Sequence, residues 1–234
     1  MPKVAFSDSY ITIWRGKDCQ SFLDGISSNL VANLKQKQVI QSAILDKNAK
    51  IIDFVSIMNL GGFLAVLGHR PNYKAMLDFI TPRILQSDVN ITDISELNDV
   101  IVSYEEYSDI EVGMCNTIND VTQARVSEKI ILMVAAKKLE IECEKMSSEF
   151  HDWRIDNLIP WYGFEIKRGT IPYSCGLDLF VHDSKGCYTG QEILTRMRTR
   201  NKGLKILRRV PSSNANSDKF TTKGDQFSLV MLNQ

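Results

Sequence analysis

Cys187 is the residue of this chain whose surroundings point most directly to chemistry. It lies in KGCYTGQE, directly after Gly186 and close to Lys185, and the QEILTRMRTR that overlaps the end of this motif has the composition of a helix. Free backbone N–H groups at a helix start and a nearby ammonium both favour thiolate over thiol, so we expect this cysteine to be more reactive than the other four. A small buried residue in a glycine turn is the simpler interpretation, because Gly186 and Gly190 can adopt backbone angles closed to other residues. The residues by themselves leave both interpretations open.

A basic segment continues from this motif. Residues 185–209 contain eight Lys or Arg and one acid, whereas residues 88–120 contain nine acids and no Lys or Arg. Arg196 and Arg200 lie one turn apart on the predicted helix and therefore share a face. Such a face could hold the negative tail of a ligand or a nucleic-acid phosphate. Two solvated faces of opposite charge explain the same pattern.

Aromatic residues form a second candidate site. Trp153, Trp161 and Tyr162 gather in the stretch DWRIDNLIPWYGFEI, and Asp156 and Glu165 are the carboxylates nearest to them. The three rings could form a wall against which a flat ligand stacks, although ordinary core packing is the favoured explanation.

Metal and general-base chemistry find little support in the sequence. Cys175, His182 and Cys187 have the spacing C-x6-H-x4-C, which matches no usual zinc pattern, so no metal site is predicted. His182 as a general base for Cys187 is equally unsupported. P-loop, GxGxxG, HExxH and GxSxG motifs are absent from the sequence, which removes the commonest nucleotide-binding, zinc-protease and serine-hydrolase classes.

The composition is that of an ordinary globular protein. The 234 residues are 44% hydrophobic and 24% charged, with a formal net charge of zero. No apolar run approaches the roughly 18 residues that a membrane span needs, and the first residues resemble neither a signal peptide nor a presequence, so we expect a cytoplasmic protein with no membrane partner. The five cysteines are widely spread and include no C-x-x-C pair, which indicates reduced thiols rather than a disulfide framework.

Hydrophobic periodicity predicts the elements of the N-terminal half. We expect a strand at 11–14, a helix that begins near Asp18, a hairpin of strands at 39–46 and 50–58, a third strand at 63–69, and a helix at 71–85 that Pro82 kinks or ends.

The second half mixes strands and helices without strict alternation, which favours an α+β fold. Strands are expected at 89–94, 99–107 and 129–136, a helix at 147–159 capped by Ser147 or Ser148, and a helix at 191–200 whose Ile193, Leu194 and Met197 face inward. Residues 211–226 are rich in Ser, Asn, Asp and Gly and indicate a flexible loop before a last strand at 227–232.

KGCYTGQE, with Arg196 downstream, resembles the signature of the YgfZ family, folate-binding relatives of the aminomethyltransferase (T-protein) of the glycine cleavage system. GKDCQSFLDGISSNLVANL is similar to the N-terminal helix of that family, AILDKNAKIIDFVSI to its Leu-Asn-x-x-Gly-Lys-x-x-Asp hairpin, and RIDNLIPWYGFEI to its Arg-x-Glu-x-Gly-x-Pro-x-x-Gly segment. The resemblance implies pseudo-symmetric subdomains, here about 1–95 and 96–210, around a central channel that holds a reduced folate, followed by a small β-barrel. After Val210 only about one strand is visible, so we expect residues 211–234 to be a truncated or vestigial remnant of that barrel.

The resemblance also implies roles for individual residues. Cys187 is the functional thiol, with Lys185 beside it as the second catalytic candidate. Arg154 and Asp156 fall where the related enzymes hold an Arg and a pterin-contacting Glu, and a carboxylate can accept two hydrogen bonds from the amino-pyrimidine edge of a pterin. The other residues assigned to the folate are Asn29, Tyr188, Gly190, Gln191, Glu192 and Arg196.

Three departures from the family pattern stand out. Asp156 is one methylene shorter than the usual Glu, and Leu158 replaces a usual Gly. The Thr-Asn-Asp that follows the N-terminal helix in the family is here Ser28, Asn29 and Leu30.

The function implied by the resemblance is binding of tetrahydrofolate, or a derivative, in support of iron–sulfur cluster assembly or repair, and through it of tRNA-modifying cluster enzymes. Because cluster irons normally take four protein ligands, Cys187 would need residues from another chain, so iron–sulfur proteins are the expected partners. The alternative from the enzyme class is folate-dependent aminomethyl transfer of the T-protein type, for which no catalytic acid can be assigned. An RNA-binding module at 196–209 is disfavoured, because the net charge is zero and no aromatic residues lie among those bases.

Overall fold

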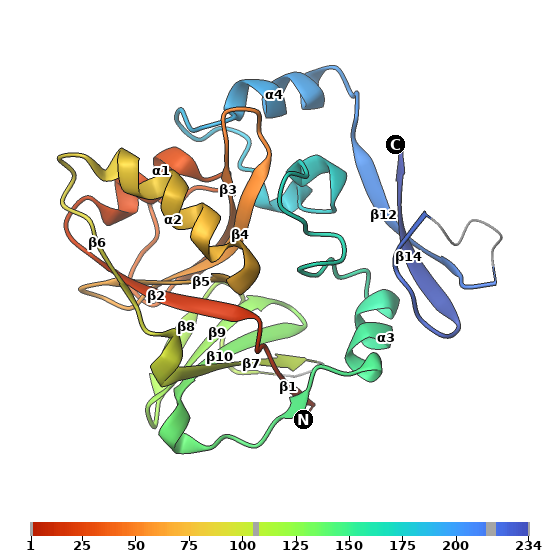
Figure 1. The fold of residues 1–234 in the computed structure, drawn as a ribbon, viewed down its shortest axis with the longest axis horizontal. Coiled ribbons are helices and arrows are strands. Elements are labelled where there is room, and N and C mark those ends of the chain that lie inside the picture. The colour runs from red at the N-terminus through yellow and green to blue at the C-terminus, as the bar shows by residue number, and fades with distance from the viewer. Residues whose placement is uncertain (1, 105–107, 214–218, 234) are drawn as a thin grey trace.

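The computed structural model describes residues 2–104, 108–213 and 219–233 as three sheets with helices on their outer faces and between them (Figure 1). The mixed α and β composition predicted from the sequence is confirmed. The last residues of the strand expected at 99–107, and part of the loop expected at 211–226, lie outside the described residues.

The first sheet has five strands in the order β3-β4-β5-β2-β6, all paired antiparallel. The hairpin predicted from the two β-branched runs is confirmed as β3 and β4, and the following strand and the N-terminal strand also form where they were expected. The strands are β2 (Ser9–Arg15), β3 (Val39–Leu45), β4 (Ile51–Asn59), β5 (Leu64–His69) and β6 (Asn90–Asp93).

Two helices cover one face of this sheet. Helix α1 (Cys19–Ile26) begins after Asp18 as predicted, and α2 (Arg70–Ile84) continues just past Pro82 before it ends. Their buried residues pack with one set of sheet side chains, among them Val55 and Val66. Side chains of opposite parity along β4, such as Phe54, belong to a different cluster on the other face. Both faces of the sheet are therefore covered, which explains why β4 is buried along all but its last residue.

The second sheet has six strands in the order β11-β1-β7-β10-β9-β8. All pairs are antiparallel except β1 with β11. Strands β8 and β9 were not predicted from the sequence, because β9 has four polar residues among its seven and only one buried position, Ala124. The strands are β1 (Lys3–Ala5), β7 (Asn98–Tyr104), β8 (Cys115–Ile118), β9 (Val121–Ser127), β10 (Ile130–Ala136) and β11 (Glu144–Lys145), with short 3-10 turns η1 (Ser95–Leu97) and η2 (Lys137–Leu139) beside them.

The segment after the second sheet is mostly helical turns and loops. Helix α3 (Ser148–Asp156) has Ser147, one of the two predicted caps, at its N-cap position, but the Ser147 hydroxyl makes no capping hydrogen bond. The helix stops short of residue 159. It is followed by η3 (Pro172–Ser174), η4 (Asp178–Phe180) and α4 (Gln191–Thr199). On α4 the predicted inward residues are confirmed, since Leu194 is buried and Ile193 and Met197 pack against the core.

The C-terminal residues form a third sheet of three strands, in the order β12-β14-β13. These are β12 (Lys205–Pro211), β13 (Phe220–Thr222) and β14 (Phe227–Asn233). The expectation of about one strand beyond Val210 is therefore wrong, because β13 forms inside the stretch predicted as a loop. Among the described residues the strands stay an open sheet, and Ile155 of α3 packs against one face. The subdomain boundary near residue 95, the pseudo-symmetry and the origin of this sheet as a barrel remnant stay predictions.

Candidate functional site

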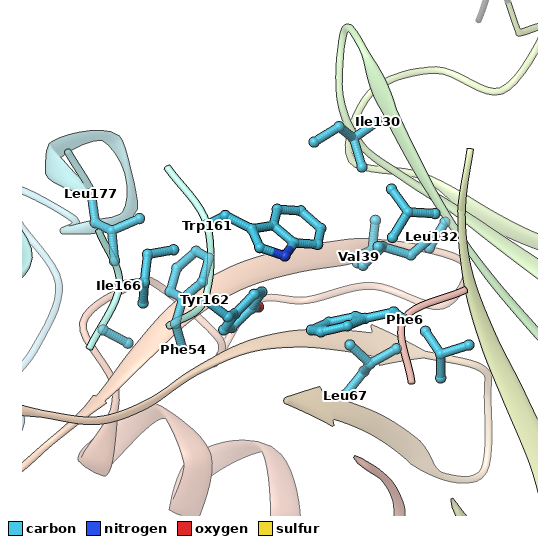
Figure 2. Close-up of a cluster of buried hydrophobic side chains, with 14 of the residues drawn as sticks. Phe6, Val39, Phe54, Leu67, Ile130, Leu132, Trp161, Tyr162, Ile166 and Leu177 are labelled. Atoms are coloured by element: carbon cyan, nitrogen blue, oxygen red, sulfur yellow. The ribbon is translucent and has the colours of Figure 1, made fainter. Parts of the chain in front are cut away.

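A cavity of about 220 Å³ lies between the two large sheets. Its walls come from the inner face of the first sheet, from β9 and β10 of the second, and from the loop segment of residues 158–180. Aliphatic and aromatic side chains share the lining, and Figure 2 shows Phe6, Phe54, Trp161 and Tyr162 among Leu67, Ile130 and Leu132. The aromatic residues of the lining are Phe6, Phe54, Trp161, Tyr162 and Phe180. A cavity with apolar aromatic walls suits a flat ligand ring.

Trp161 and Tyr162 are held rigidly in this wall. The backbone N–H of Trp161 donates to the buried carboxylate of Glu165 over 3.1 Å, and Tyr162 forms a β-bridge with Ile166. Tyr162 also packs against Phe6, with ring centroids 5.2 Å apart. Of the three aromatic residues singled out in the sequence, two therefore line the cavity, whereas Trp153 packs in the core and does not reach it.

Two polar groups of the cavity wall have no partner. Trp161 and Tyr162 are only 5% and 7% exposed, yet neither the indole Nε1–H nor the phenol hydroxyl forms a hydrogen bond with any residue in the described ranges. Burial and the nearby Asp53 raise the pKa of the Tyr162 hydroxyl well above its ordinary value, so the hydroxyl keeps its proton. Neither atom is sealed from solvent, so the indole N–H is open to a hydrogen-bond acceptor in the cavity, either water or a ligand.

Gln41 supplies a complementary acceptor. Its side-chain Nε2 donates to Ser56 Oγ over 3.1 Å, and with the amide assigned in this orientation Oε1 is left as the free end at the cavity. Gln41 shares a strand face with Val39 and Ala43, which belong to the core between the sheets. A polar residue on an otherwise apolar strand face is a signal that the sequence does contain and that period-2 reasoning could have found.

The described lining of the cavity contains no Asp, Glu, His, Lys or Arg. Hydrogen bonding and ring stacking are what this wall offers a ligand, and a proton donor or acceptor for acid–base catalysis would have to come from the ligand or from solvent.

Arg154 does not line the cavity. Its guanidinium is fully buried, pairs with Glu165 over 2.9 Å and also donates to Thr222 Oγ1 in β13 and to His151 Nδ1. Burial lowers the pKa of Arg154 while Glu165 raises it. With its donors used inside the protein, Arg154 holds α3 against the C-terminal sheet, and its contact with a pterin stays a prediction.

Asp156 also faces away from the cavity. It is exposed at the end of α3, and its Oδ1 lies 2.6 Å from Nη1 of Arg209 in β12. The hollow beside it is lined by Asp152 and Phe227 among others and is separate from the aromatic cavity. Asp156 therefore does not line the aromatic cavity, and its contact with a pterin stays a prediction.

Lys185 is buried and points into the end of α1. Its ammonium donates to the backbone carbonyls of Asp24, Ser27 and Asn29 at 2.6, 3.0 and 2.8 Å, and lies 3.1 Å from the Asp24 carboxylate. The carbonyls of Asp24 and Ser27 are among those that a helix C-terminus leaves without partners, so Lys185 caps α1 and also holds the chain that follows it at Asn29. Burial lowers the pKa of Lys185, and Asp24 opposes this shift. The ammonium is thus engaged by α1 rather than free beside Cys187.

Cys187 is exposed, unlike Cys19, Cys115 and Cys175, which are buried, and Cys143, which is half-buried. The interpretation as a small buried residue is therefore wrong. The thiol also does not sit at the first turn of α4, because the loop continues to Gly190, which is the N-cap.

The loop that carries Cys187 is pinned on both sides. Before it, Lys185 reaches α1, and after it the N–H of Thr189 donates to the carbonyl of Gly25 over 3.0 Å. Gly190 has φ +84 and packs so closely on the turn of the β3–β4 hairpin that a Cβ would lie 2.8 Å from Cα of Ala49. The loop therefore presents an exposed thiol from a fixed backbone.

The remaining predicted folate residues are spread around this loop, and none of them lines the aromatic cavity. Tyr188 is buried, and the Lys185 ammonium lies 5.0 Å from the centroid of its ring. Asn29 Nδ2 donates to the backbone carbonyl of Gln41. Glu192 and Arg196 form an exposed ion pair on α4. Gln191 donates to the carbonyl of Lys185 over 3.4 Å, which fastens the start of α4 to the same loop.

A similar fold is known among solved structures. The crystal structure of the glycine cleavage system aminomethyltransferase T from Bartonella henselae aligns with 99% of this chain and 78% of its own, with a TM-score of 0.78 and 12% sequence identity. This chain has the aminomethyltransferase T fold. A heterotetrameric sarcosine oxidase from Corynebacterium sp. U-96, solved with pyrrole 2-carboxylate, aligns with 59% of this chain and 76% of its own at 12% identity and a TM-score of 0.40.

At 12% identity the similarity to aminomethyltransferase T extends to the fold alone. No protein-family model matches the chain, and no curated protein matches it by sequence. No helix in the described part of the chain is long and apolar enough to cross a membrane.

Proposed function

We propose that this protein binds a reduced folate, tetrahydrofolate or a derivative, with the ring in the aromatic cavity, and that it supports iron–sulfur cluster assembly or repair through Cys187. The observation that carries the folate half is the cavity wall of Trp161 and Tyr162, which has unpaired polar atoms within an aminomethyltransferase T fold. The resemblance of the KGCYTGQE motif to the YgfZ signature supports the second half.

The cavity residues fit the flat ring of a pterin. Phe6, Phe54 and Trp161 offer faces for stacking, the indole N–H can donate to a ring acceptor, and Gln41 Oε1 can accept from a ring amine. When bound, a reduced folate supplies one-carbon carrier chemistry at its reduced ring. The chain itself binds and orients that ring and excludes water from its faces.

Cys187 is proposed to act outside this cavity, at the protein surface. An exposed thiol on a fixed loop can reach a partner, and one cysteine provides one of the four ligands that cluster irons normally take, so an iron–sulfur protein would supply the others. Tetrahydrofolate binding and the thiol are therefore separate parts of the proposal, with separate tests. Effects on tRNA-modifying cluster enzymes would follow from the second part.

Aminomethyl transfer of the T-protein type is the alternative. The neutral lining of the cavity gives it no added support, because no described residue there can act as a general acid or base near neutral pH. Release of ammonia from an aminomethyl-lipoyl donor, dependent on tetrahydrofolate, would favour this alternative.

The folate half is tested by anaerobic calorimetric titration of the purified protein with tetrahydrofolate. We expect saturable binding that Trp161→Phe weakens by about threefold to tenfold, because the variant keeps the ring and removes one hydrogen-bond donor. Asp156→Ala is the matched control and should bind like the wild type, since Asp156 pairs with Arg209 away from the cavity. Loss of binding in Asp156→Ala with normal binding in Trp161→Phe would reject the cavity as the folate site.

The cluster half is tested by complementation. In a strain that lacks the protein, the wild type should restore the activity of cluster enzymes and Cys187→Ser should not. Cys143→Ser is the control, because it removes a half-buried thiol far along the chain from the motif. Full restoration by Cys187→Ser would reject the role of this thiol.

A further inference from the structure

The aromatic cavity is too small to enclose the whole of a ligand that consists of a ring and a long substituent. Its volume is about 220 Å³, whereas sites that enclose ligands of drug size span about 300–1,000 Å³. A bicyclic ring fills a space of this size, so any substituent on the ring must leave through the opening and lie against the rim.

Two leucines make one part of the rim apolar. Leu158 and Leu179 both line the cavity, yet they are 42% and 91% exposed. Large side chains that are this exposed beside a cavity mouth offer an apolar surface to whatever passes between them.

A lysine lies next to this surface. Lys129 sits in the turn between β9 and β10, between Ser127 and Ile130, which both line the cavity. Its ammonium donates to Oδ1 of Asn157, the residue directly before Leu158, so the charge is held at the rim.

The Lys129 ammonium has no carboxylate partner among the described residues. The nearest acid in sequence, Glu128, pairs with Arg125 at 3.6 Å instead. Asn157 is itself fixed, because its Nδ2 donates to the carbonyl of Trp153 over 2.8 Å. An ammonium that is oriented by a neutral amide and not neutralised by an acid can still bind an anion.

We infer that Lys129 binds the anionic tail of a ligand whose ring occupies the aromatic cavity, with Leu158 and Leu179 in contact with the apolar spacer between ring and anion. This inference rests on the proposed function and extends it, because it assigns the site to ring ligands that carry a carboxylate. The tail contributes through one exposed charge, so the expected effect is modest and sensitive to salt.

The test compares two ligands in the same calorimetric assay: tetrahydrofolate, which has a glutamate tail, and 6-methyltetrahydropterin, which has the reduced ring without it. We expect Lys129→Gln to weaken tetrahydrofolate binding by about threefold to tenfold and to leave 6-methyltetrahydropterin binding unchanged. Lys129→Arg should retain most of the affinity. Lys137→Gln, on η2 outside the cavity, is the control and should change neither ligand.

Salt gives a second readout. Raising NaCl from 20 to 300 mM should weaken wild-type binding of tetrahydrofolate and have little effect on the Lys129→Gln variant, because the screened interaction is already absent. Equal affinity of wild type and Lys129→Gln for tetrahydrofolate would overturn the inference and leave the proposed function standing. Equal weakening of both ligands would also overturn it, since the lysine would then act through the rim and not through the tail. If the wild type binds neither ligand, the proposed function fails and this inference fails with it.

Discussion

Arg154 and Glu165 form an ion pair in which both side chains are fully buried, with Nη1 and Oε2 2.9 Å apart. Thr222 of β13 completes the arrangement, because its hydroxyl donates to the other oxygen of Glu165 over 2.6 Å and accepts a hydrogen bond from Arg154. Glu165 also receives the backbone N–H of Trp161. One buried cluster therefore joins α3, the cavity wall and the C-terminal sheet.

Glu165→Gln should destabilise the protein strongly. The substitution leaves the Arg154 guanidinium buried without its counter-charge, and breaking a buried pair in this way costs about 3–5 kcal/mol in free energy of unfolding. Urea unfolding followed by tryptophan fluorescence measures the loss. The double variant Arg154→Met/Glu165→Leu should be less destabilised than Glu165→Gln, because it buries no unpaired charge. A loss below about 1 kcal/mol for Glu165→Gln would contradict the assigned role.

Cys187 should be the one thiol that reacts quickly in the folded protein. Burial raises the pKa of Cys115 to about 11 and that of Cys175 to about 12, and it also raises the pKa of Cys19 and Cys143. Each unit of pKa lowers the thiolate fraction tenfold, so Cys115 and Cys175 should react with iodoacetamide at pH 8 at least about tenfold more slowly than the exposed Cys187. Cys19 and Cys143 should also react more slowly, because burial disfavours their thiolates. Peptide mass spectrometry after timed labelling identifies the residue. Retention of the fast phase in Cys187→Ser would show that another thiol is responsible.

Asp53 should make the protein less stable as the pH rises from about 5 to 7. Its carboxyl is fully buried on β4, accepts hydrogen bonds from Tyr10 and Asn72, and has a pKa raised by burial to about 7, against 3.8 for the unfolded chain. Between these two pH values the folded state binds more protons than the unfolded state, so the free energy of unfolding falls with rising pH. At about 1.4 kcal/mol per unit, the Asp53 contribution between pH 5 and 7 is about 2–3 kcal/mol.

Asp53→Asn isolates this contribution. The lowered pKa values of His69 and His151 produce a slope of opposite sign below pH 6.5, but they do so in both proteins and cancel when wild type and variant are compared. Urea unfolding at pH 5.0 and 7.0 should show that stability falls more steeply in the wild type than in the variant. Parallel pH profiles would mean that Asp53 does not titrate in this range.

Leu158→Gly should stabilise the protein slightly. Leu158 has φ +54, a left-handed conformation that costs an L residue about 1–2 kcal/mol, and its side chain is 42% exposed, so little burial is lost. Glycine loses more conformational entropy on folding, and this cost offsets part of the relieved strain. The free energy of unfolding, measured by thermal or urea unfolding, should therefore rise by about 0.5–1 kcal/mol. Leu179→Gly, at the other rim leucine, has no such strain to relieve and should destabilise. If Leu158→Gly lowered the free energy of unfolding as much as Leu179→Gly does, this account would be contradicted.

Much of the fold could be predicted because its signals are local. The β3–β4 hairpin follows from two β-branched runs around a short turn, and α1, α2 and α4 follow from apolar residues at helical spacing. Strand β13 could not be predicted, because only the neighbouring β14 makes a strand of the polar stretch around Thr222. When pairing with a neighbouring strand determines that a segment becomes a strand, the residues of that segment give only a weak sequence signal for it.

The sequence by itself indicated Cys187 as the candidate reactive cysteine and Trp153, Trp161 and Tyr162 as a candidate aromatic wall, and it left ordinary packing open for both. Only the tertiary structure decided which groups the charged side chains bind. Lys185 donates hydrogen bonds to carbonyls at the end of α1, one of them 161 positions away in the sequence. Asp156 pairs with Arg209, which is 53 positions away. A charged side chain binds whichever counter-group the fold brings within reach, and that distance in space is set by packing between segments that no local pattern relates.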